Sequence, residues 1–172
     1  MPYDPAKHHR RSIRLKEYDY EQPGAYFVTI VTHQRELLFD DSVLRRIAQT
    51  MWSRIQSHFA QVTLDEWIVM PNHIHGILVI EDRPEEGKRV TAAGAPSPGS
   101  LGIIVGNFKS VTARRINRVR KTPDTLVWQR NYYERVIRNE RELAAIRKYI
   151  AQNPQNWELD REHPSNANGP KR

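Results

Sequence analysis

Residues 62–80 read VTLDEWIVMPNHIHGILVI, and this stretch decides the fold. Residues 62–70 alternate in polarity and are rich in β-branched and aromatic side chains, which is typical of a strand, and residues 74–80 form a second apolar run. The dipeptide Pro71-Asn72 separates the two runs and is typical of a turn. The stretch therefore predicts a β-hairpin.

The segments around this hairpin predict further strands and helices. Residues 25–32 are β-branched and aromatic and predict a strand. Residues 41–59 repeat apolar side chains every three or four positions behind Asp40 or Asp41 as a cap, and predict an amphipathic helix. Ser100 can cap a second helix, whose apolar stripe consists of Val105, Phe108, Thr112, Ile116 and Val119.

The last third of the chain adds one more helix. Residues 125–128 and 132–137 are short extended candidates. Asn139 and Glu142 form a capping pair for a helix that ends at Pro154, because proline cannot continue the hydrogen-bond ladder. The order strand, helix, strand, strand, helix, strand, helix predicts an α+β domain with an antiparallel sheet flanked by helices.

The chain of 172 residues is expected to hold one domain with two tails. Residues 1–23 are polar and basic and are interpreted as an arm, residues 24–158 as the domain, and residues 159–172 as a C-terminal tail. Residues 82–100 are rich in glycine and proline and predict a flexible surface loop that interrupts the domain without dividing it.

The composition favours a polyanionic partner. The chain has 27 Lys and Arg against 20 Asp and Glu, a net charge of +7, so nucleic acid is the leading partner class, although many basic proteins have no such ligand. Cysteine is absent, which excludes disulfides, thiolate zinc sites and a cysteine nucleophile. No apolar run is long enough to cross a membrane, and a cytoplasmic location is expected.

His73 and His75 are two residues apart at the start of an apolar run, and a strand therefore places both imidazoles on one face. Two imidazoles can bind one divalent ion and leave coordination positions for a third protein ligand, water or a substrate oxygen. A pair of hydrogen-bonded structural histidines is the alternative interpretation.

Tyr149 and Asn153 are four residues apart and share one face of the last predicted helix. The Asn153 carbonyl is a hard ligand that, with two imidazoles, suits magnesium (Mg2+) or manganese (Mn2+). From this helix alone, the favoured interpretation is that Tyr149 is a half-buried aromatic residue and Asn153 a helix-ending amide.

Three motifs in this order resemble the REP-associated tyrosine transposases, which are single-tyrosine HUH transposases. The motifs are MPNHIHG at residues 70–76, WQRNYYE at 128–134 and YIAQNP at 149–154, and the resemblance extends from about residue 11 to residue 160. It implies a ferredoxin-like HUH endonuclease core in which His73 and His75 hold a divalent metal. It also implies that Tyr149 is the nucleophile and that Asn153 is a further metal ligand.

The function implied by the resemblance is that of a metal-dependent endonuclease and strand transferase. It acts on single-stranded, hairpin-forming repeat DNA through a 5′-phosphotyrosine intermediate. A monomer and a homodimer are both consistent with the sequence. Cationic side chains are expected to bind phosphates, although each could instead belong to a solvated face; they are Arg10, Arg11, Arg14, Lys16, Lys109, Arg114, Arg118 and Arg130.

Other interpretations stay open at this point. A noncatalytic RNA- or DNA-binding module on a ferredoxin-like sheet explains the charge but not the two histidines. A metal-independent phosphoesterase needs two His-x-Ser or His-x-Thr motifs, and only residues 163–165 fit that pattern. A relaxase or replication initiator shares the same chemistry. Tyr132 and Tyr133 are alternative nucleophiles, but their expected place in a strand favours Tyr149.

Overall fold

The computed structural model describes residues 22–82 and 99–166. Its centre is a four-stranded sheet in the order β2-β3-β1-β4, in which every neighbouring pair is antiparallel. The strands are β1 (Gly24–Val31), β2 (Val62–Met70), β3 (His73–Ile80) and β4 (Tyr133–Ile137). The predicted hairpin is confirmed, since β2 and β3 are joined through Pro71 and Asn72.

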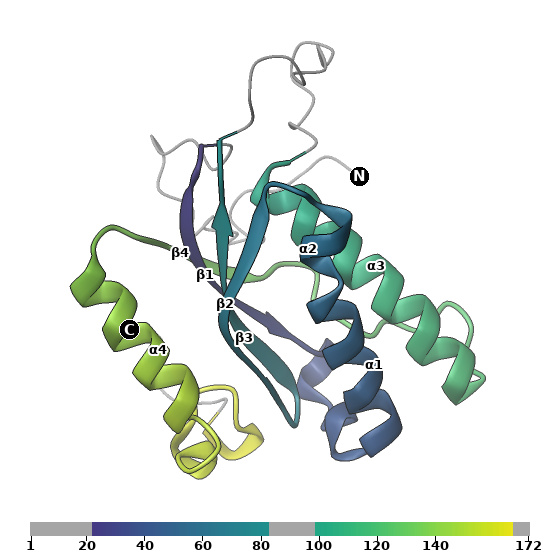
Figure 1. Cartoon of the computed structure of the whole chain (residues 1–172). Helices are drawn as coiled ribbons and strands as arrows, with labels where there is room; N and C mark the ends of the chain where they lie inside the picture. Colours follow the sequence, from purple (N-terminus) through teal and green to yellow (C-terminus); the bar gives the residue numbers. More distant parts are fainter. Residues whose placement is uncertain (1–21, 83–98, 167–172) are drawn as a thin grey trace, which may run out of the picture.

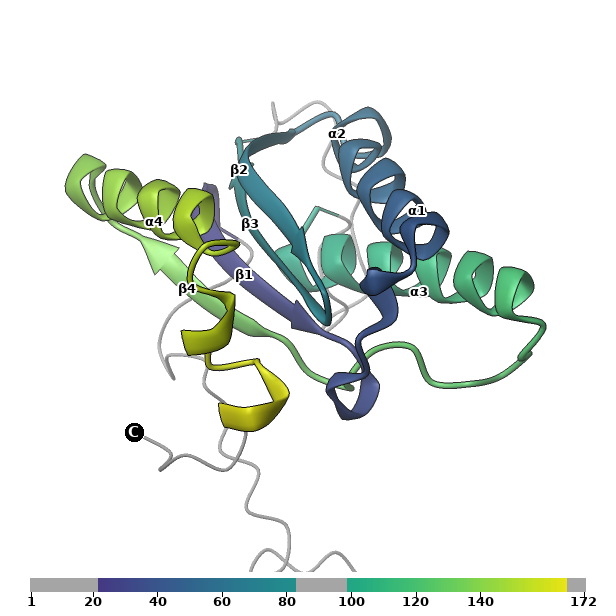
Figure 2. The ribbon, with the colours of Figure 1, turned by 90° about the horizontal axis from the view of Figure 1, so that it is seen from below.

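Helices cover both faces of this sheet. Figures 1 and 2 show α1 (Ser42–Ser53), α2 (Ile55–His58) and α3 (Leu101–Arg120) on one face and α4 (Glu140–Gln152) on the other. Short 3-10 helices complete the chain: η1 (His33–Arg35), η2 (Leu38–Asp40), η4 (Trp157–Leu159) and η5 (Pro164–Asn166). The predicted α+β fold with an antiparallel sheet flanked by helices is confirmed.

The two faces of the sheet build two separate apolar clusters. The larger cluster lies between the sheet and α1 to α3 and includes Trp52, which is fully buried. The smaller one joins Phe27 and Ile77 of the central strands to Ile146 and Ile150 of α4. Because both faces are covered, the central strands β1 and β3 are buried along nearly their whole length. The sheet is thus a rigid support for side chains on its α4 face.

The prediction of one continuous helix over residues 41–59 is wrong, because the structure divides this segment at Arg54 into α1 and α2. Asp41 caps α1 by accepting hydrogen bonds from the backbone N–H groups of Val43 and Leu44, as predicted. Near the break, the Ser53 hydroxyl donates to the Gln49 carbonyl. Serine hydroxyls that bond back to the preceding turn weaken and bend a helix, which gives a physical reason for the division.

Two further predictions need correction in the second half of the chain. Residues 125–128 do not form a strand, and only an isolated bridge pairs Trp128 with Thr32. Just beyond, the Lys109 ammonium donates to the carbonyls of Gln129 and Arg130, which holds this backbone as a loop. Val119 was placed in the apolar stripe of α3 but is 49% exposed, because the last turn of α3 extends past the core.

Some expectations concern residues outside the described ranges. The basic arm lies there except for Gln22 and Pro23, and so does most of the predicted loop at residues 82–100. Within the described residues, none of the helices has the length and apolar character that a membrane crossing requires.

Candidate metal and nucleophile site

His73 and His75 project together toward the α4 side of the sheet, as their spacing predicts. Their Nε2 atoms are 3.0 Å apart, and both side chains are buried. The sheet register sets Thr29 of β1 opposite His75, and the His75 ring contacts Phe27 of β1 and Tyr149 of α4. The hairpin therefore delivers two imidazoles to one enclosed point.

The other ring nitrogens of this pair are held by polar neighbours. His73 Nδ1 bonds to Asn72 Oδ1 at 2.8 Å, and His75 Nδ1 bonds to the Thr29 hydroxyl at 2.8 Å. Because an amide oxygen only accepts, His73 Nδ1 carries the proton and Nε2 keeps its lone pair. When His75 also donates from Nδ1, two lone pairs face each other, and a cation stabilises such an arrangement.

Tyr149 and Asn153 reach the same point from α4. The Tyr149 hydroxyl is 3.3 Å from His75 Nε2, while the side chain is 46% exposed and so is open to a substrate. Asn153, one turn later, is buried. Its Oδ1 atom is buried without a hydrogen-bond partner among the described residues. The structure thus brings together all four residues that the sequence singles out: two imidazoles, a phenol and an amide.

Asp160 is a fifth member of this site that the sequence did not reveal. Its Oδ2 atom lies 3.9 Å from His73 Nε2 and 3.7 Å from His75 Nε2, and it accepts a hydrogen bond from Asn153 Nδ2 at 2.8 Å. The ligand atoms of His73, His75 and Asp160 all lie within 4.8 Å of one another. A buried carboxylate therefore stands beside the two imidazoles.

The segment that carries Asp160 is fastened to the rest of the site. Asn72 Nδ2 donates to the Glu162 carbonyl at 2.7 Å, and Arg35 Nε donates to the Glu162 carboxylate at 3.0 Å. The Trp157 ring lies against the His73 ring, with centroids 5.8 Å apart. Although Asp160 falls in the predicted tail, these contacts integrate it with the sheet. The bulky Trp157 was the available hint, since an indole is seldom left in water.

The electrostatics of the site favour a bound cation. Burial, reinforced by the neighbouring His75, lowers the pKa of His73 to about 3, so that ring is neutral at physiological pH. Burial alone would raise the pKa of the Asp160 carboxyl, but the nearby His75 ring and the hydrogen bonds from the Glu162 N–H and Asn153 outweigh it and hold the pKa well below its usual range. A neutral imidazole beside an anionic carboxylate is a suitable ligand set for a divalent ion.

The same surroundings keep the phenol protonated. Burial raises the pKa of Tyr149 to about 12, and the negative charge of Asp160 acts in the same direction. A phenol with this pKa is a poor nucleophile at neutral pH. A cation beside Asp160 would offset that charge and favour the phenolate.

A cleft of about 540 Å³ opens onto this site. His75, Tyr149 and Asp160 line it. Arg35 and Arg161 also line it and are positively charged, but neither is among the phosphate-binding residues predicted from the sequence. Tyr132 and Tyr133, the alternative nucleophiles, also line the cleft. Tyr149 is favoured over them by the short distance between its hydroxyl and His75 Nε2.

The predicted phosphate-binding cations are not gathered in one place. Arg10, Arg11, Arg14 and Lys16 lie outside the described residues. Arg114 and Arg118 are exposed on α3, on the opposite face of the sheet from α4, as Figure 2 shows. Arg130 is exposed in the loop that leads to β4. Lys109 is committed to backbone carbonyls, and burial lowers its pKa. Their role in binding phosphate stays a prediction.

The chain is similar to one curated protein in sequence and to a solved transposase in structure. No protein-family model matches it. An uncharacterized protein of Haemophilus influenzae is 38% identical over 174 residues, which cover 92% of this chain and 95% of the Haemophilus protein. The solved structure of a REP-associated tyrosine transposase bound to a REP hairpin is similar with a TM-score of 0.58 and 16% identity, over 88% of this chain and 77% of that one. The chain therefore has a fold similar to that of this transposase, as the resemblance of the motifs implies.

Proposed function

Because this chain belongs to the same family as the Haemophilus influenzae protein and has the fold of a REP-associated tyrosine transposase, we propose that it is a metal-dependent enzyme that cuts and rejoins single-stranded DNA. One observation supports this most strongly: the Tyr149 hydroxyl is 3.3 Å from His75 Nε2, inside a cluster of metal-binding side chains. A noncatalytic nucleic-acid-binding module does not require this convergence.

The donor set fits a divalent metal. The separations of 3.0, 3.7 and 3.9 Å among His73, His75 and Asp160 suit donors that share one ion, since ligands about 2.1 Å from a metal lie roughly 3 to 4 Å from each other. Asn153 Oδ1, which is buried and unpartnered among the described residues, is available as a further oxygen ligand. Two nitrogens and two oxygens favour Mg2+ or Mn2+ over a metal that prefers sulfur.

When bound, the ion supplies positive charge that polarises a nonbridging oxygen of the scissile phosphate. The residues of the chain orient the reaction. Asn72 and Thr29 hold the two imidazoles through their Nδ1 atoms. Tyr149 is placed by the contact of its ring with Phe27, at a centroid distance of 6.1 Å, so that its hydroxyl stays near the same point.

In the proposed cleavage step, the Tyr149 oxygen forms a bond to phosphorus and the bond from phosphorus to the 3′-oxygen breaks. The phenolic proton is lost to solvent, and the 3′-oxygen leaves with a proton as a free hydroxyl. The product is a 5′-phosphotyrosine ester. Because the ester that forms and the ester that breaks are similar in energy, a second 3′-hydroxyl can reverse the step and join strands without ATP.

The substrate is proposed to be a DNA hairpin with single-stranded flanks. The structurally similar transposase was solved with a REP hairpin, and Arg161, which lines the cleft here, can meet a phosphate. The cytoplasmic location and the oligomeric state, monomer or homodimer, stay predictions.

A covalent capture assay with two labels tests the function. The protein is mixed with Mn2+ and hairpin oligonucleotides labelled at either the 5′ or the 3′ end, then denatured and separated. We expect a protein-linked band that carries the 3′ label, and a shorter free fragment that carries the 5′ label. A band that carries the 5′ label instead would reverse the proposed polarity, and a chelator should abolish both products.

Tyrosine variants identify the nucleophile in the same assay. Tyr149→Phe should remove the protein-linked band, whereas Tyr133→Phe, a matched change in the same cleft, should retain it. An undiminished band in Tyr149→Phe would contradict the assignment. His73→Ala and His75→Ala should lose cleavage but keep much of their DNA affinity. If chelation leaves DNA binding unchanged and no variant or condition yields an adduct, the noncatalytic binding module is the better description.

A further inference from the structure

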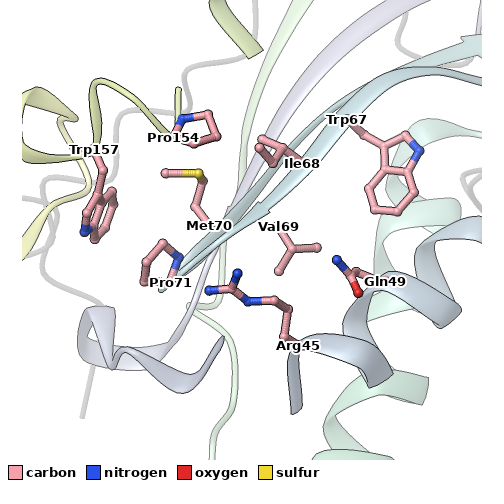
Figure 3. A pocket seen from close by; sticks show the side chains of 9 residues that line it. All are labelled: Arg45, Gln49, Trp67, Ile68, Val69, Met70, Pro71, Pro154 and Trp157. Atoms are coloured by element: carbon pink, nitrogen blue, oxygen red, sulfur yellow. The ribbon is translucent and has the colours of Figure 1, made fainter. Parts of the chain in front are cut away.

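A second cavity lies next to the proposed metal site, at the β2 edge of the sheet. It measures about 470 Å³, within the range of pockets that hold small organic groups. Figure 3 shows Arg45 and Gln49 of α1 on one side, Trp157 and Pro154 on the opposite side, and Trp67 of β2 at one end. None of the processes proposed above uses this cavity.

The cavity is built from the chain segments that also carry the metal ligands. Met70 and Pro71 line it and lead directly into the hairpin turn before His73, and Met70 pairs with His73 in the sheet. Pro154 follows Asn153 in sequence. The Trp157 ring that lines the cavity also packs against the His73 ring. A molecule in this cavity is therefore separated from the metal site by single side chains.

The lining has the chemistry that recognises an unpaired nucleotide. Trp67 and Trp157 offer indole rings, and the Met70, Pro71 and Pro154 side chains offer apolar surface. Gln49 offers an amide that can donate to and accept from the edge of a base. No acidic side chain is among the described residues that line the cavity.

Arg45 supplies the positive charge for a phosphate. Its Nε donates to the Phe39 carbonyl at 2.6 Å, which holds the side chain in place. Among the described residues no carboxylate forms an ion pair with it. A positioned guanidinium without a competing acid is suited to bind a phosphate oxygen. This charge favours a nucleotide over an apolar peptide or a second copy of the chain.

We propose that this cavity binds one unpaired nucleobase of the DNA strand that Tyr149 attacks, and that Arg45 binds the phosphate of the same nucleotide. The proposal rests on the proposed function. Holding one base at a fixed distance from the metal site determines which phosphate along the strand reaches Tyr149. The cavity is thus a specificity-determining subsite for the cleavage position.

Abasic scanning in the presence of a chelator tests base binding in the cavity while metal-dependent cleavage is prevented. Hairpin oligonucleotides with an abasic residue at each flanking position in turn are titrated into the full-length protein, and tryptophan fluorescence quenching reports binding. We expect one abasic position near the cleavage site to weaken binding roughly tenfold, as loss of one stacked base does. Equal affinity for every abasic strand would overturn the proposal.

A matched pair of arginine variants on α1 provides the control. Arg45→Ala should weaken binding of the intact strand several-fold and reduce the penalty of the sensitive abasic position. Arg46→Ala removes the same charge from the neighbouring residue, which does not line the cavity, and should leave both quantities within about twofold. Equal effects of the two variants would show general attraction of the DNA and contradict a subsite.

Photochemical cross-linking gives a second measurement that needs no variant. A photoreactive base at the sensitive position should attach to Arg45, Gln49, residues 67–71 or residues 154–157, which surround the cavity, and attachment elsewhere would overturn the proposal. The two proposals fail separately. Quenching that depends on one base, without any covalent adduct, would support the subsite and contradict the proposed cleavage. An adduct together with equal affinity for every abasic strand would support the cleavage and contradict the subsite.

Discussion

The distance of 3.0 Å between the Nε2 atoms of His73 and His75 is the contact with the clearest physical meaning in this protein. Both rings are buried and each is oriented by a polar neighbour at Nδ1. When His75 donates from Nδ1, both Nε2 atoms keep their lone pairs, and a shared cation beside the Asp160 carboxylate satisfies these better than they satisfy each other. Binding of the proposed metal ion is therefore expected to stabilise the fold.

The first prediction concerns thermal unfolding with and without Mn2+. An ion that binds only the folded state stabilises it by about 2.7 kcal/mol at 100 times its Kd, so Mn2+ should raise the Tm. His73→Ala and Asp160→Ala should lose most of this increase. His58→Ala, which replaces an exposed histidine of α2, should keep it. The proposed metal site would be contradicted if the Tm of the parent protein does not change with Mn2+, Mg2+ or a chelator.

The second prediction concerns Gly76, which follows His75 in β3. A Cβ atom built at this position overlaps the Trp52 ring, which is fully buried and cannot move freely. Gly76→Ala should lower the free energy of unfolding by about 1–3 kcal/mol, as overpacked cores do. It should also weaken Mn2+ binding, because the strain is adjacent to His75. Urea unfolding and metal titration measure the two effects.

Gly106→Ala is the matched control for this change. A Cβ at Gly106 has no neighbouring atom within 4 Å, and the residue lies in the interior of α3. Alanine is favoured over glycine within a helix by about 0.5–1 kcal/mol, so this variant should gain stability. Similar losses in both variants would show that the Trp52 contact is not the cause.

At the scale of elements, the site has two halves, because α4 carries Tyr149 and Asn153 while β3 carries the histidines. An apolar contact and an ion pair hold α4 against the sheet. Ile146 and Ile150 pack against Phe27 and Ile77, and Arg147 forms a two-pronged ion pair with Asp65 of β2, with Nε 2.8 Å from Oδ1. The hydrogen bond from Arg147 lowers the pKa of Asp65.

The third prediction follows from this ion pair. Because the pKa of Asp65 is lower in the folded state, the pair stabilises the fold above the unfolded-state value near 3.8, and this contribution is lost as the pH falls through the lower folded-state pKa. Asp65→Asn should cause a small loss of stability at pH 7, as expected for a partly exposed pair. The difference from the parent should vanish in strong acid.

Denaturant unfolding at several pH values measures this dependence. Arg147→Gln serves as the complementary variant, and adding Asp65→Asn to it should cause little further loss. A constant difference between Asp65→Asn and the parent across the acid range would contradict the ion pair.

The order of the elements could be predicted from the sequence because each has a periodic pattern of its own. Residues 62–70 largely alternate along β2, apart from a bulge between Leu64 and Trp67. Asn139 caps α4 by accepting a hydrogen bond from the Glu142 N–H, as predicted. Local pattern also placed His73, His75, Tyr149 and Asn153. Asp160 could not be found in this way, since no periodicity marks it.

What brings Asp160 into the site is tertiary structure. It lies seven residues beyond Asn153, after a change of direction at η4, and its position depends on contacts between Glu162 and the distant residues Arg35 and Asn72. Such long-range contacts leave no local signal. The exposure of Val119 is of the same kind, because it depends on where α3 leaves the core.

Across the whole molecule, the positive charge is spread over both layers, whereas the proposed chemistry is confined to the α4 side. Arg35 and Arg161 line the cleft there. Arg114 and Arg118 belong to α3, which lies in the other layer (Figure 2). A net charge of +7 attracts DNA to any face. Only cations near the bound strand release counterions on binding.

The fourth prediction uses the salt dependence of DNA affinity to locate the strand. Arg161→Ala should reduce the slope of log K against log salt by roughly 0.7, the value for one contact to single-stranded nucleic acid. Arg114→Ala should leave the slope unchanged if the strand remains on the α4 side. Binding titrations at four or more salt concentrations distinguish the two results, and equal losses would show that the DNA also reaches α3.

The wide separation along the chain between the two halves of the site has a consequence for protein synthesis. Tyr149 follows His75 by 74 residues, and Asp160 comes later still. A growing polypeptide on the ribosome therefore exposes its hairpin well before it contains the attacking hydroxyl. Chains that stop within this interval lack Tyr149, so they would be unable to carry out the proposed cleavage of DNA.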